Sequence, residues 1–597
     1  MYGGYQRVPS GCSDASIFAT DYVLPGSPGP SSSVSEVSFN EKQSTATATI
    51  ELFEESFADV SVKLRAYLRS RGRWVYDISR CLGGTTLGPI LPSFLRPRGL
   101  NETSEPAHVN SIATLDGVRG FACFFVFNFH FLFMYTLTSV RGYGVDPTGA
   151  SNRWMHQLPI IKLLYGGRSM VCVFFVLSGY VLSRKPLMAL RSKSYDSMLQ
   201  SLSSSIFRRG IRLFLPTIIS TFIVMLTIRA GWFKRATEVA RDGVTMAFVE
   251  HHPVYFGTWQ EQAWDYWNFV THYIDFTNWG EWYNLYDPHV WTIPLEFRAS
   301  MVLFVVLVGL SRARTAWRLV LASAFIIFCG RWGRFEIVLF LAGALLAELD
   351  LIANTWGSGR GRGGAPILPT AIPLPTTPPA TPTPVDKRLA VPSASTSSQV
   401  ASLPRTFLHA TFFVTGLYLL SFPDEFGDFT PGYATLSRNI PAAYRANCAY
   451  RFWQSIGAVL ALHAICNAAV LRRPFQTPLA QYLGKVSYAF YLVHGPVLHS
   501  LGFVTMRWLF GVAGRYKYIE PVDQGQVPGA GAAADAELPK VVDAGTMGNA
   551  SFAACLFVGW VFLLAVSIWL ADIFWRVVDI PCVKFTRWVE YRVMGKE

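Results

Sequence analysis

The stretch "LDGVRGFACFFVFNFHFLFMYTL", residues 115–137, has the composition of a membrane span but carries two ionisable groups, Arg119 and His130. Eleven residues at 100° each make three turns plus about 20°, so the two side chains share one helix face. They are separated by about 16 Å along the helix axis. An ionisable group inside a bilayer is costly, so His130 is a candidate functional residue facing a cavity. The alternative is a neutral His130 that is hydrogen-bonded by a neighbouring helix.

The rest of the chain repeats this apolar character. Of its 597 residues, 51% are hydrophobic and only 15% are charged, and the apolar residues form runs of roughly 16–22 residues, enough to cross a hydrocarbon core of about 30 Å. The sequence predicts an all-α integral membrane protein with a bundle of about ten transmembrane helices. The expected spans lie near residues 118–138, 163–183, 211–231, 293–311, 316–330, 335–352, 406–422, 452–471, 483–504 and 551–575.

The distribution of charge orients these spans. With ten spans and a cytosolic N-terminus, four basic segments fall on the cytosolic side, as the positive-inside rule requires: 183–212, 311–318, 470–474 and 583–588. The acidic segment 234–290 falls on the opposite side. We therefore expect a multi-pass protein of an endomembrane or the plasma membrane, with both termini cytosolic. The basic residues form no soluble domain with interleaved aromatic residues, so no nucleic-acid partner is expected.

Composition also divides the chain. Residues 1–105 are predicted to be a cytosolic tail, largely disordered, because Ser, Gly, Pro and Thr dominate its first part. Residues 106–597 form the predicted transmembrane domain. Within it, the Pro/Gly/Ser/Thr-rich segment 353–405 is expected to be a low-complexity cytosolic loop, and 512–548 is expected to be a non-cytosolic loop.

A second group of cations accompanies Arg119. Arg209 and Arg212, in "FRRGIRLFLP", are three residues apart and share a face at the cytosolic start of the third span. Together with Arg119 they would form a cluster whose planar guanidinium groups can bind phosphate oxygens. The alternative is that they only obey the positive-inside rule.

Three further polar residues lie in predicted spans. Glu296, in "WTIPLEF", could orient a histidine, bind an acceptor hydroxyl or form an ion pair with an arginine. His494 precedes Pro496, which cannot donate a hydrogen bond in the helix and predicts a kink. Ser178 is either a small residue for close helix packing or a nucleophile that would need a nearby base. No Cys/His cluster has zinc-ligand spacing, so no metal site is predicted.

Six of these segments resemble the acyltransferase 3 family of multi-pass membrane enzymes, in the family's order. They are "LDGVRGFACFFVFNFH", "FFVLSGYVLS", "FRRGIRLFLP", "VWTIPLEF", "FLAGALLAE" and "LGKVSYAFYLVHGPV". The resemblance covers about residues 110–590. It implies O-acyl transfer, usually of acetyl, from a cytosolic acyl-CoA to a hydroxyl, often on a carbohydrate or lipid-linked acceptor. The long tail, the 353–405 loop and the 512–548 insertion are typical of eukaryotic, fungal-like members and leave the acceptor open.

The resemblance also implies roles for residues. The family's Arg-x10-His pattern falls on Arg119 and His130, and its Arg-x-x-Arg pattern falls on Arg209 and Arg212. The histidine is the family's catalytic residue, and its arginines are associated with the CoA donor. The family's glutamate corresponds to Glu296.

These observations lead to one hypothesis and two rivals. His130 would act as the general base, because the pKa of histidine lies close to neutral pH, and transfer would be direct or through an acyl-enzyme. The expected partners are acyl-CoA as donor substrate, a hydroxyl-bearing acceptor and membrane lipids, with no permanently bound cofactor. A proton-coupled transporter is the alternative function, since intramembrane histidines and proline-broken helices would also suit a carrier. A non-catalytic scaffold ranks last.

Overall fold

The structure is a computed structural model. It describes residues 111–353, 403–519 and 540–595, apart from residues 148, 150, 242–244, 249, 447 and 544–546. The predicted tail, 1–105, and residues 354–402 of the predicted low-complexity loop lie outside the described residues.

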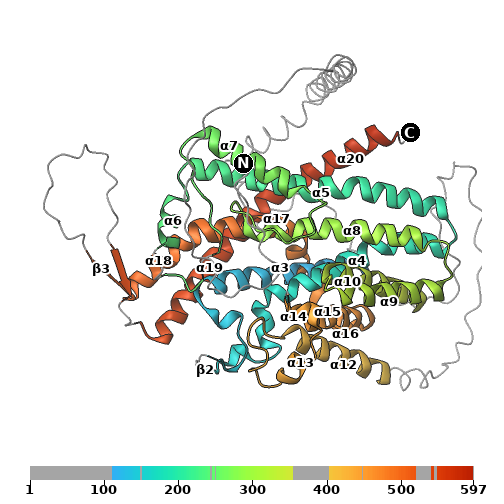
Figure 1. The fold of residues 1–597 in the computed structure, drawn as a ribbon, viewed down its shortest axis with the longest axis horizontal. Helices are drawn as coiled ribbons and strands as arrows, with labels where there is room; N and C mark the ends of the chain where they lie inside the picture. Colours follow the sequence, from blue (N-terminus) through green and yellow to red (C-terminus); the bar gives the residue numbers. More distant parts are fainter. Residues whose placement is uncertain are drawn as a thin grey trace, which may run out of the picture. The chain divides into compact units, whose positions relative to one another are not determined.

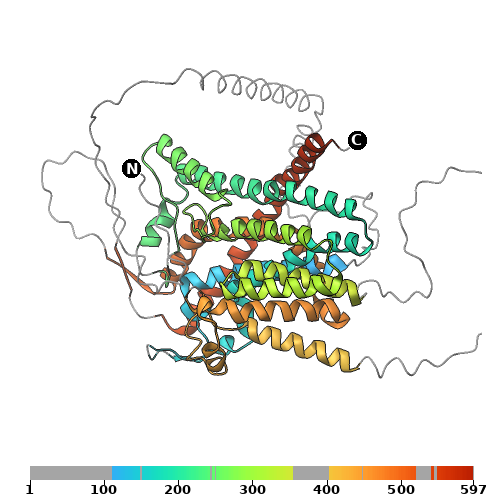
Figure 2. The ribbon, with the colours of Figure 1, turned by 45° about the vertical axis from the view of Figure 1, so that its right-hand side comes forward.

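Ten long helices dominate the described part, and each coincides with one of the predicted apolar spans. They are α3 (Ser111–Tyr135), α4 (Gly167–Arg191), α5 (Tyr195–Arg229), α8 (Thr292–Gly309), α9 (Thr315–Arg331), α10 (Phe335–Ala353), α12 (Leu403–Leu420), α15 (Tyr450–Asn467), α17 (Pro478–Val497) and α19 (Asn549–Phe574). Most of them lie side by side with their axes in similar directions (Figures 1 and 2). The all-helical core predicted from the apolar runs is therefore confirmed.

Short elements connect the long helices. The α-helical ones are α6 (Lys234–Arg241), α7 (Trp259–Tyr273), α13 (Ala434–Arg438), α14 (Ala442–Arg445), α16 (Ala469–Arg472), α18 (Phe503–Val512) and α20 (Ile580–Met594). The 3-10 turns are η1 (Leu137–Ser139), η2 (Met155–Gln157), η3 (Ile161–Tyr165), η4 (Pro288–Trp291) and η5 (Arg473–Gln476), and the π-helical segments are η6 (Leu498–Gly502) and η7 (Trp575–Asp579).

The described strands form two antiparallel pairs, which the sequence did not predict. They are β1 (Gly144–Val145) with β2 (Ser151–Asn152), and β3 (Tyr516–Ile519) with β4 (Lys540–Asp543). The second pair lies within the predicted non-cytosolic loop, 512–548.

The number of ten membrane spans is not confirmed. Among the described residues, six helices are long and apolar enough to cross a membrane, or seven if the bent pair Tyr450–Asn467 and Ala469–Gln476 is one span. Other long helices fall short for different reasons. Helix α9 has 17 residues, and α10 buries three carboxylates, Glu336, Glu348 and Asp350, within an otherwise apolar sequence. Length and charge thus separate these helices from an ordinary span.

Helices α3 and α17 pack in parallel at close range. A Cβ atom added to Gly120 of α3 would lie 2.4 Å from the backbone nitrogen of Gly484 in α17, so only glycine permits this approach. Further along both helices, the rings of His130 and His494 have centroids 5.4 Å apart. The contacts advance in the same direction along both helices, so α3 and α17 share one continuous face. Arg119 and His130 both lie along this face.

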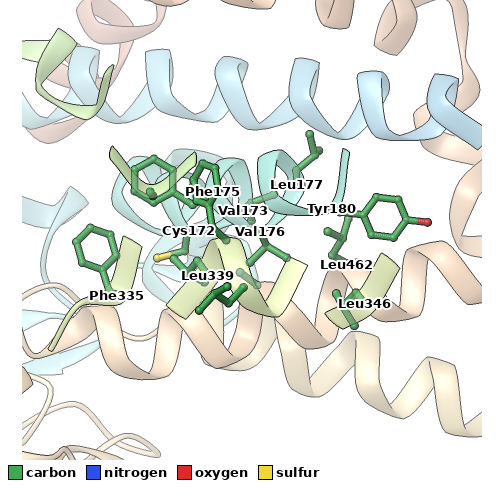
Figure 3. Close-up of a cluster of buried hydrophobic side chains, with 14 of the residues drawn as sticks. Cys172, Val173, Phe175, Val176, Leu177, Tyr180, Phe335, Leu339, Leu346 and Leu462 are labelled. Carbon is green, nitrogen blue, oxygen red and sulfur yellow. The ribbon is translucent and has the colours of Figure 1, made fainter. Parts of the chain in front are cut away.

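The apolar core between α4 and α10 also depends on glycine. Gly179 and Gly343 face the partner backbone: added Cβ atoms would lie 2.1 Å from the carbonyl oxygens of Phe340 and Val176, respectively. Around this crossing, large side chains interdigitate, as Figure 3 shows for Phe175 and its neighbours. Small residues at a membrane-helix crossing let backbones approach and gain dispersion contacts.

A buried lysine predicts how stability depends on pH. Lys162, in η3, is 4% exposed and donates to the carbonyl of Val140 at 3.1 Å. Burial lowers its pKa from 10.5 to about 8, although Asp424 opposes the shift. The folded chain therefore releases this proton near pH 8, whereas the unfolded chain keeps it to about pH 10.5, so this site adds stability as pH rises through that interval. We expect the difference in Tm between the wild type and Lys162→Met to grow in favour of the wild type from pH 7.5 to pH 9.5, in thermal melts of the detergent-solubilised protein. Equal slopes with pH in both proteins would contradict this assignment.

Candidate active site

His130 lies within a buried cluster of histidines and carboxylates. It is five residues from the end of α3, and its side chain is 17% exposed. We call the group the histidine–carboxylate cluster; its members are His130, Glu250, Asp287, His289, His494 and His499. The carboxylate of Glu250 contacts the imidazoles of His130, His289 and His499, and the carboxylate of Asp287 contacts His289.

The hydrogen-bond geometry gives Glu250 the central position. Its Oε1 lies 3.3 Å from Nδ1 of His130, and its Oε2 lies 2.9 Å from Nε2 of His289 and 3.1 Å from Nε2 of His499. On the other side of His289, Nδ1 lies 2.9 Å from Oδ1 of Asp287. Because Nδ1 of His130 faces Glu250, its Nε2 is the nitrogen left for other chemistry.

Three separate parts of the chain supply these groups. His130 comes from α3, and Glu250 comes from the segment between α6 and α8. Asp287 is the N-cap of η4 in the same segment, where its carboxylate accepts from the backbone N–H of His289 at 3.1 Å. This cap fixes the turn that presents His289, because an Asp side chain satisfies a free N–H at a helix start. His494 and His499 come from α17 and η6.

The end of α17 is shaped by Pro496. Its missing N–H leaves the carbonyl of Leu492 without a helical partner, and the hydroxyl of Ser220 in α5 donates to that carbonyl at 3.0 Å. The helix continues to Val497 and then widens into the π-helical η6. Hydrogen bonds in a π-helix span five residues, so His494 and His499, five apart, come to the same side.

Gly495 completes the packing at this point. An added Cβ atom would lie 2.3 Å from Nδ1 of His289 and 2.6 Å from Oδ1 of Asp287. The backbone of α17 thus supports the Asp287–His289 pair directly.

The electrostatics favour an ionised Glu250. Burial alone would raise the pKa of this carboxyl, but the charge of His289 and the hydrogen bonds with His130 and His289 outweigh burial. The pKa of Glu250 is held well below its usual range. The cluster therefore carries a buried negative charge that can stabilise a positive charge on a neighbouring imidazole.

Of the predicted arginines, Arg119 lies on the α3–α17 face, whereas Arg209 and Arg212 lie in α5. Arg119 donates to the hydroxyl of Ser487 at 3.0 Å and to the carbonyl of Gly484 at 3.1 Å, and it forms an exposed ion pair with Asp116. Arg212 interacts electrostatically with both Arg209 and Arg119. The structure thus brings the three predicted cations together, at a separate place from the histidines.

Glu296 and Ser178 belong to the arginine group. Glu296 Oε1 lies 2.7 Å from a guanidinium nitrogen of Arg209 and accepts from Ser178 Oγ at 3.0 Å. Of the alternatives that the sequence left open for Glu296, the structure shows the ion pair with an arginine. The contact found for Ser178 is with this carboxylate rather than with a histidine.

Sequence reasoning missed Glu250, Asp287, His289 and His499. The first three lie in a segment expected to be outside the membrane, where a carboxylate or a histidine is ordinary. The only available signal was "DPHVW", in which an acidic residue, a proline and a histidine directly precede the "WTIPLEF" motif. The pairing of Glu250 with His130 has no local pattern, because 120 residues separate them.

The cluster also contains two groups of potential metal ligands. His130, His289 and His494 form one, and Glu250, His289 and His499 form the other; within each group the ligand atoms lie within 4.8 Å of one another. Ligands from distant segments explain why no metal-binding spacing is visible in the sequence.

Comparison with known proteins identifies the family. A model of the acyltransferase domain of the acyltransferase 3 family matches residues 112–576, most of the chain. The chain belongs to the acyltransferase 3 family. The family predicted from six short motifs is confirmed, and with it an O-acyltransferase that is a multi-pass membrane protein.

Curated relatives agree with this assignment. The chain is similar to the O-acetyltransferase PaAT-1 of Phomopsis amygdali, with 29% identity over 84% of this chain and 89% of the relative. It is also similar to the acyltransferase clz18 of Cochliobolus lunatus, with 28% identity over 67% of this chain and 86% of the relative. No solved structure matches the chain.

Proposed function

We propose that this acyltransferase 3 enzyme transfers an acetyl group from cytosolic acetyl-CoA to a hydroxyl of a carbohydrate, lipid or secondary metabolite, with His130 as general base. The observation that carries the proposal is the hydrogen bond between Nδ1 of His130 and Glu250. A carboxylate on one imidazole nitrogen fixes the tautomer and leaves the other nitrogen as a base, as in hydrolase triads. The name of the relative from Phomopsis amygdali, an O-acetyltransferase, supports acetyl as the acyl group.

In the proposed step, His130 carries one proton from the acceptor hydroxyl to the leaving thiolate. Nε2 of His130 takes the proton of the acceptor hydroxyl while the oxygen attacks the thioester carbonyl. The new C–O bond forms, the C–S bond breaks, and the imidazolium of His130 returns the proton to the departing thiolate of CoA. The ionised Glu250 stabilises the imidazolium while it exists.

The donor would lie along the face shared by α3 and α17. Arg119, Arg209 and Arg212 would hold the phosphates of CoA, because guanidinium groups pair well with phosphate oxygens. Arg119 and His130 are about 16 Å apart along the axis of α3. A pantetheine arm suits that separation, so the thioester would end beside His130. This arrangement requires the arginine end of α3 to face the cytosol, with both chain termini on that side.

The function is tested with the purified full-length protein, labelled acetyl-CoA and a lipid and metabolite extract of the cells that express it. We expect loss of thioester and transfer of label to a hydroxyl-bearing product, both dependent on the extract. No thioester loss above that of heat-inactivated protein would contradict the proposed donor. Label retained on the protein would indicate an acyl-enzyme rather than direct transfer.

The arginines should act on donor binding. We expect Arg212→Ala and Arg119→Ala to raise the KM for acetyl-CoA by about 10- to 100-fold, because each loses a charge-assisted contact of about 1.5–3 kcal/mol. The value of kcat should change much less. Arg438→Ala, an exposed residue in α13, is the matched control and should leave KM unchanged. A fall in kcat with an unchanged KM would assign the two arginines to another role.

A further inference from the structure

The histidine–carboxylate cluster has two features that bear on the binding of an ion. Both nitrogens of His289 face carboxylate oxygens, those of Asp287 and Glu250, at 2.9 Å each. Without another ion this imidazole must hold two protons. In the second feature, Nδ1 of His494 lies 2.7 Å from the carbonyl oxygen of Tyr491 and so must donate. The other nitrogen of His494, Nε2, then presents a lone pair.

Among the described residues, no group donates a hydrogen bond to that lone pair, although His494 is only 1% exposed. A buried acceptor without a partner costs free energy of about 1–3 kcal/mol. A ring nitrogen of His494 lies within 4.8 Å of ring nitrogens of His130 and His289. An imidazole nitrogen without a proton donor thus lies beside two other histidines, in a cluster whose members can all donate electron pairs.

We propose that the cluster binds one zinc-class divalent cation, with Glu250 Oε2, His289 Nε2 and His499 Nε2 as ligands. Ligands about 2.0–2.1 Å from zinc at tetrahedral angles lie about 3.3 Å apart. The Oε2 of Glu250 lies 2.9 Å from one imidazole nitrogen and 3.1 Å from the other, close to that spacing. All three side chains are nearly buried, with exposed fractions of 12%, 1% and 2%, so the ligands are held in place by packing.

The surroundings of His289 have the pattern that metal sites use, whereas Nδ1 of His499 meets no hydrogen-bond partner among the described residues. A histidine that binds a metal through one nitrogen usually donates its other N–H to a carboxylate or a backbone carbonyl. Asp287 accepts from Nδ1 of His289 in this way. The η4 N-cap and Gly495 hold Asp287 and His289 together, so the orientation of His289 is set before any ion arrives.

The proposed ligands leave His130 free for catalysis. Glu250 would bind the cation through Oε2 and accept from His130 through Oε1, so one carboxylate would join the two sites. Two histidines and one glutamate are a ligand set that leaves a fourth position open on zinc. An acceptor hydroxyl at that position would lose its proton to His130 more readily, because a bound cation lowers the pKa of a coordinated oxygen.

Metal content tests the inference without any turnover. The full-length protein is purified in detergent without a polyhistidine tag, washed in metal-free buffer and analysed by inductively coupled plasma mass spectrometry. We expect about one zinc per chain in the wild type and in His463→Ala, a half-buried histidine of α15 that lies beside Asn467. We expect at least a tenfold lower content in His499→Ala and in Glu250→Gln.

A second measurement avoids variants that fail to fold. Wild-type protein is stripped with a chelator and titrated with Co²⁺, and we expect intense visible absorption bands of tetrahedral cobalt that saturate at one equivalent. Wild-type protein without bound metal and without saturable cobalt bands would overturn the inference, and so would full metal content in His499→Ala and Glu250→Gln. The inference and the proposed function fail separately: a metal-free wild type that still transfers acetyl refutes only the metal, and a metal-loaded wild type that leaves the thioester intact refutes only the proposed function.

Discussion

Replacing His130 with alanine should abolish acyl transfer while the protein remains folded. General-base catalysis by a placed histidine contributes about 10²–10⁴-fold, so we expect kcat to fall by at least about 100-fold. The KM for acetyl-CoA should change little, because the proposed phosphate contacts lie at the arginine end of α3. Initial rates of thioester loss, measured with the purified variant at several donor concentrations, separate the two effects.

A matched variant distinguishes catalysis from folding. His463→Ala removes another histidine from a long helix, but His463 contacts His409 and Asn467 rather than the cluster. Its kcat should stay within about twofold of the wild type. If His130→Ala elutes as a monodisperse peak and still turns over at the wild-type rate, His130 is not the base.

Gly343→Ala should strongly destabilise the fold. The added Cβ atom would lie 2.1 Å from the carbonyl oxygen of Val176 and 2.6 Å from the backbone nitrogen of Tyr180, both in α4. Backbone atoms cannot rotate away as a flexible side chain can, so α4 and α10 must separate. Overpacking by a single added group costs about 1–3 kcal/mol, and loss of the surrounding core contacts adds to that cost. Thermal melts in detergent should show a clearly lower Tm.

The control for this prediction is Gly309→Ala at the end of α8. An added Cβ atom there meets nothing within 4 Å, so its Tm should match the wild type. Equal Tm values for Gly343→Ala and the wild type would mean that α4 and α10 do not approach each other this closely.

The helices and one of the two polar groups could be predicted from the sequence. The apolar runs predict all ten long helices because each helix presents a continuous apolar surface to other helices or to lipid. Arg209 and Arg212 could be assigned to one helix face because they are three residues apart, and Arg119 could be grouped with them because all three were expected on the cytosolic side. The predicted number of spans is not confirmed, since α10 carries three buried carboxylates within its apolar sequence.

The histidine site could be predicted only in part. The position of His130 in a span marks it as unusual, but no periodicity relates α3 to a connecting segment, and Glu250 is an ordinary loop residue by composition. Pro496 predicts a disturbed helix. Only the structure shows that the disturbance is a π-helical turn, which brings His499 to the same side of the helix as His494. The candidate histidine could therefore be predicted from the sequence, whereas its chemical surroundings required the fold.

The late position of α17 has a consequence for biogenesis. His130 is synthesised early and His499 near the other end of the chain, while Glu250 and Asp287 emerge between them. A nascent chain that ends before α17 holds Glu250 without His499, one of its three imidazole partners, and lacks the α17 backbone that packs against Asp287 and His289. Water or a chaperone must then cover the incomplete cluster, because charges that are only partly paired do not bury. Truncation before α17 should thus yield a polypeptide that the quality-control machinery of its membrane removes, rather than a smaller active enzyme.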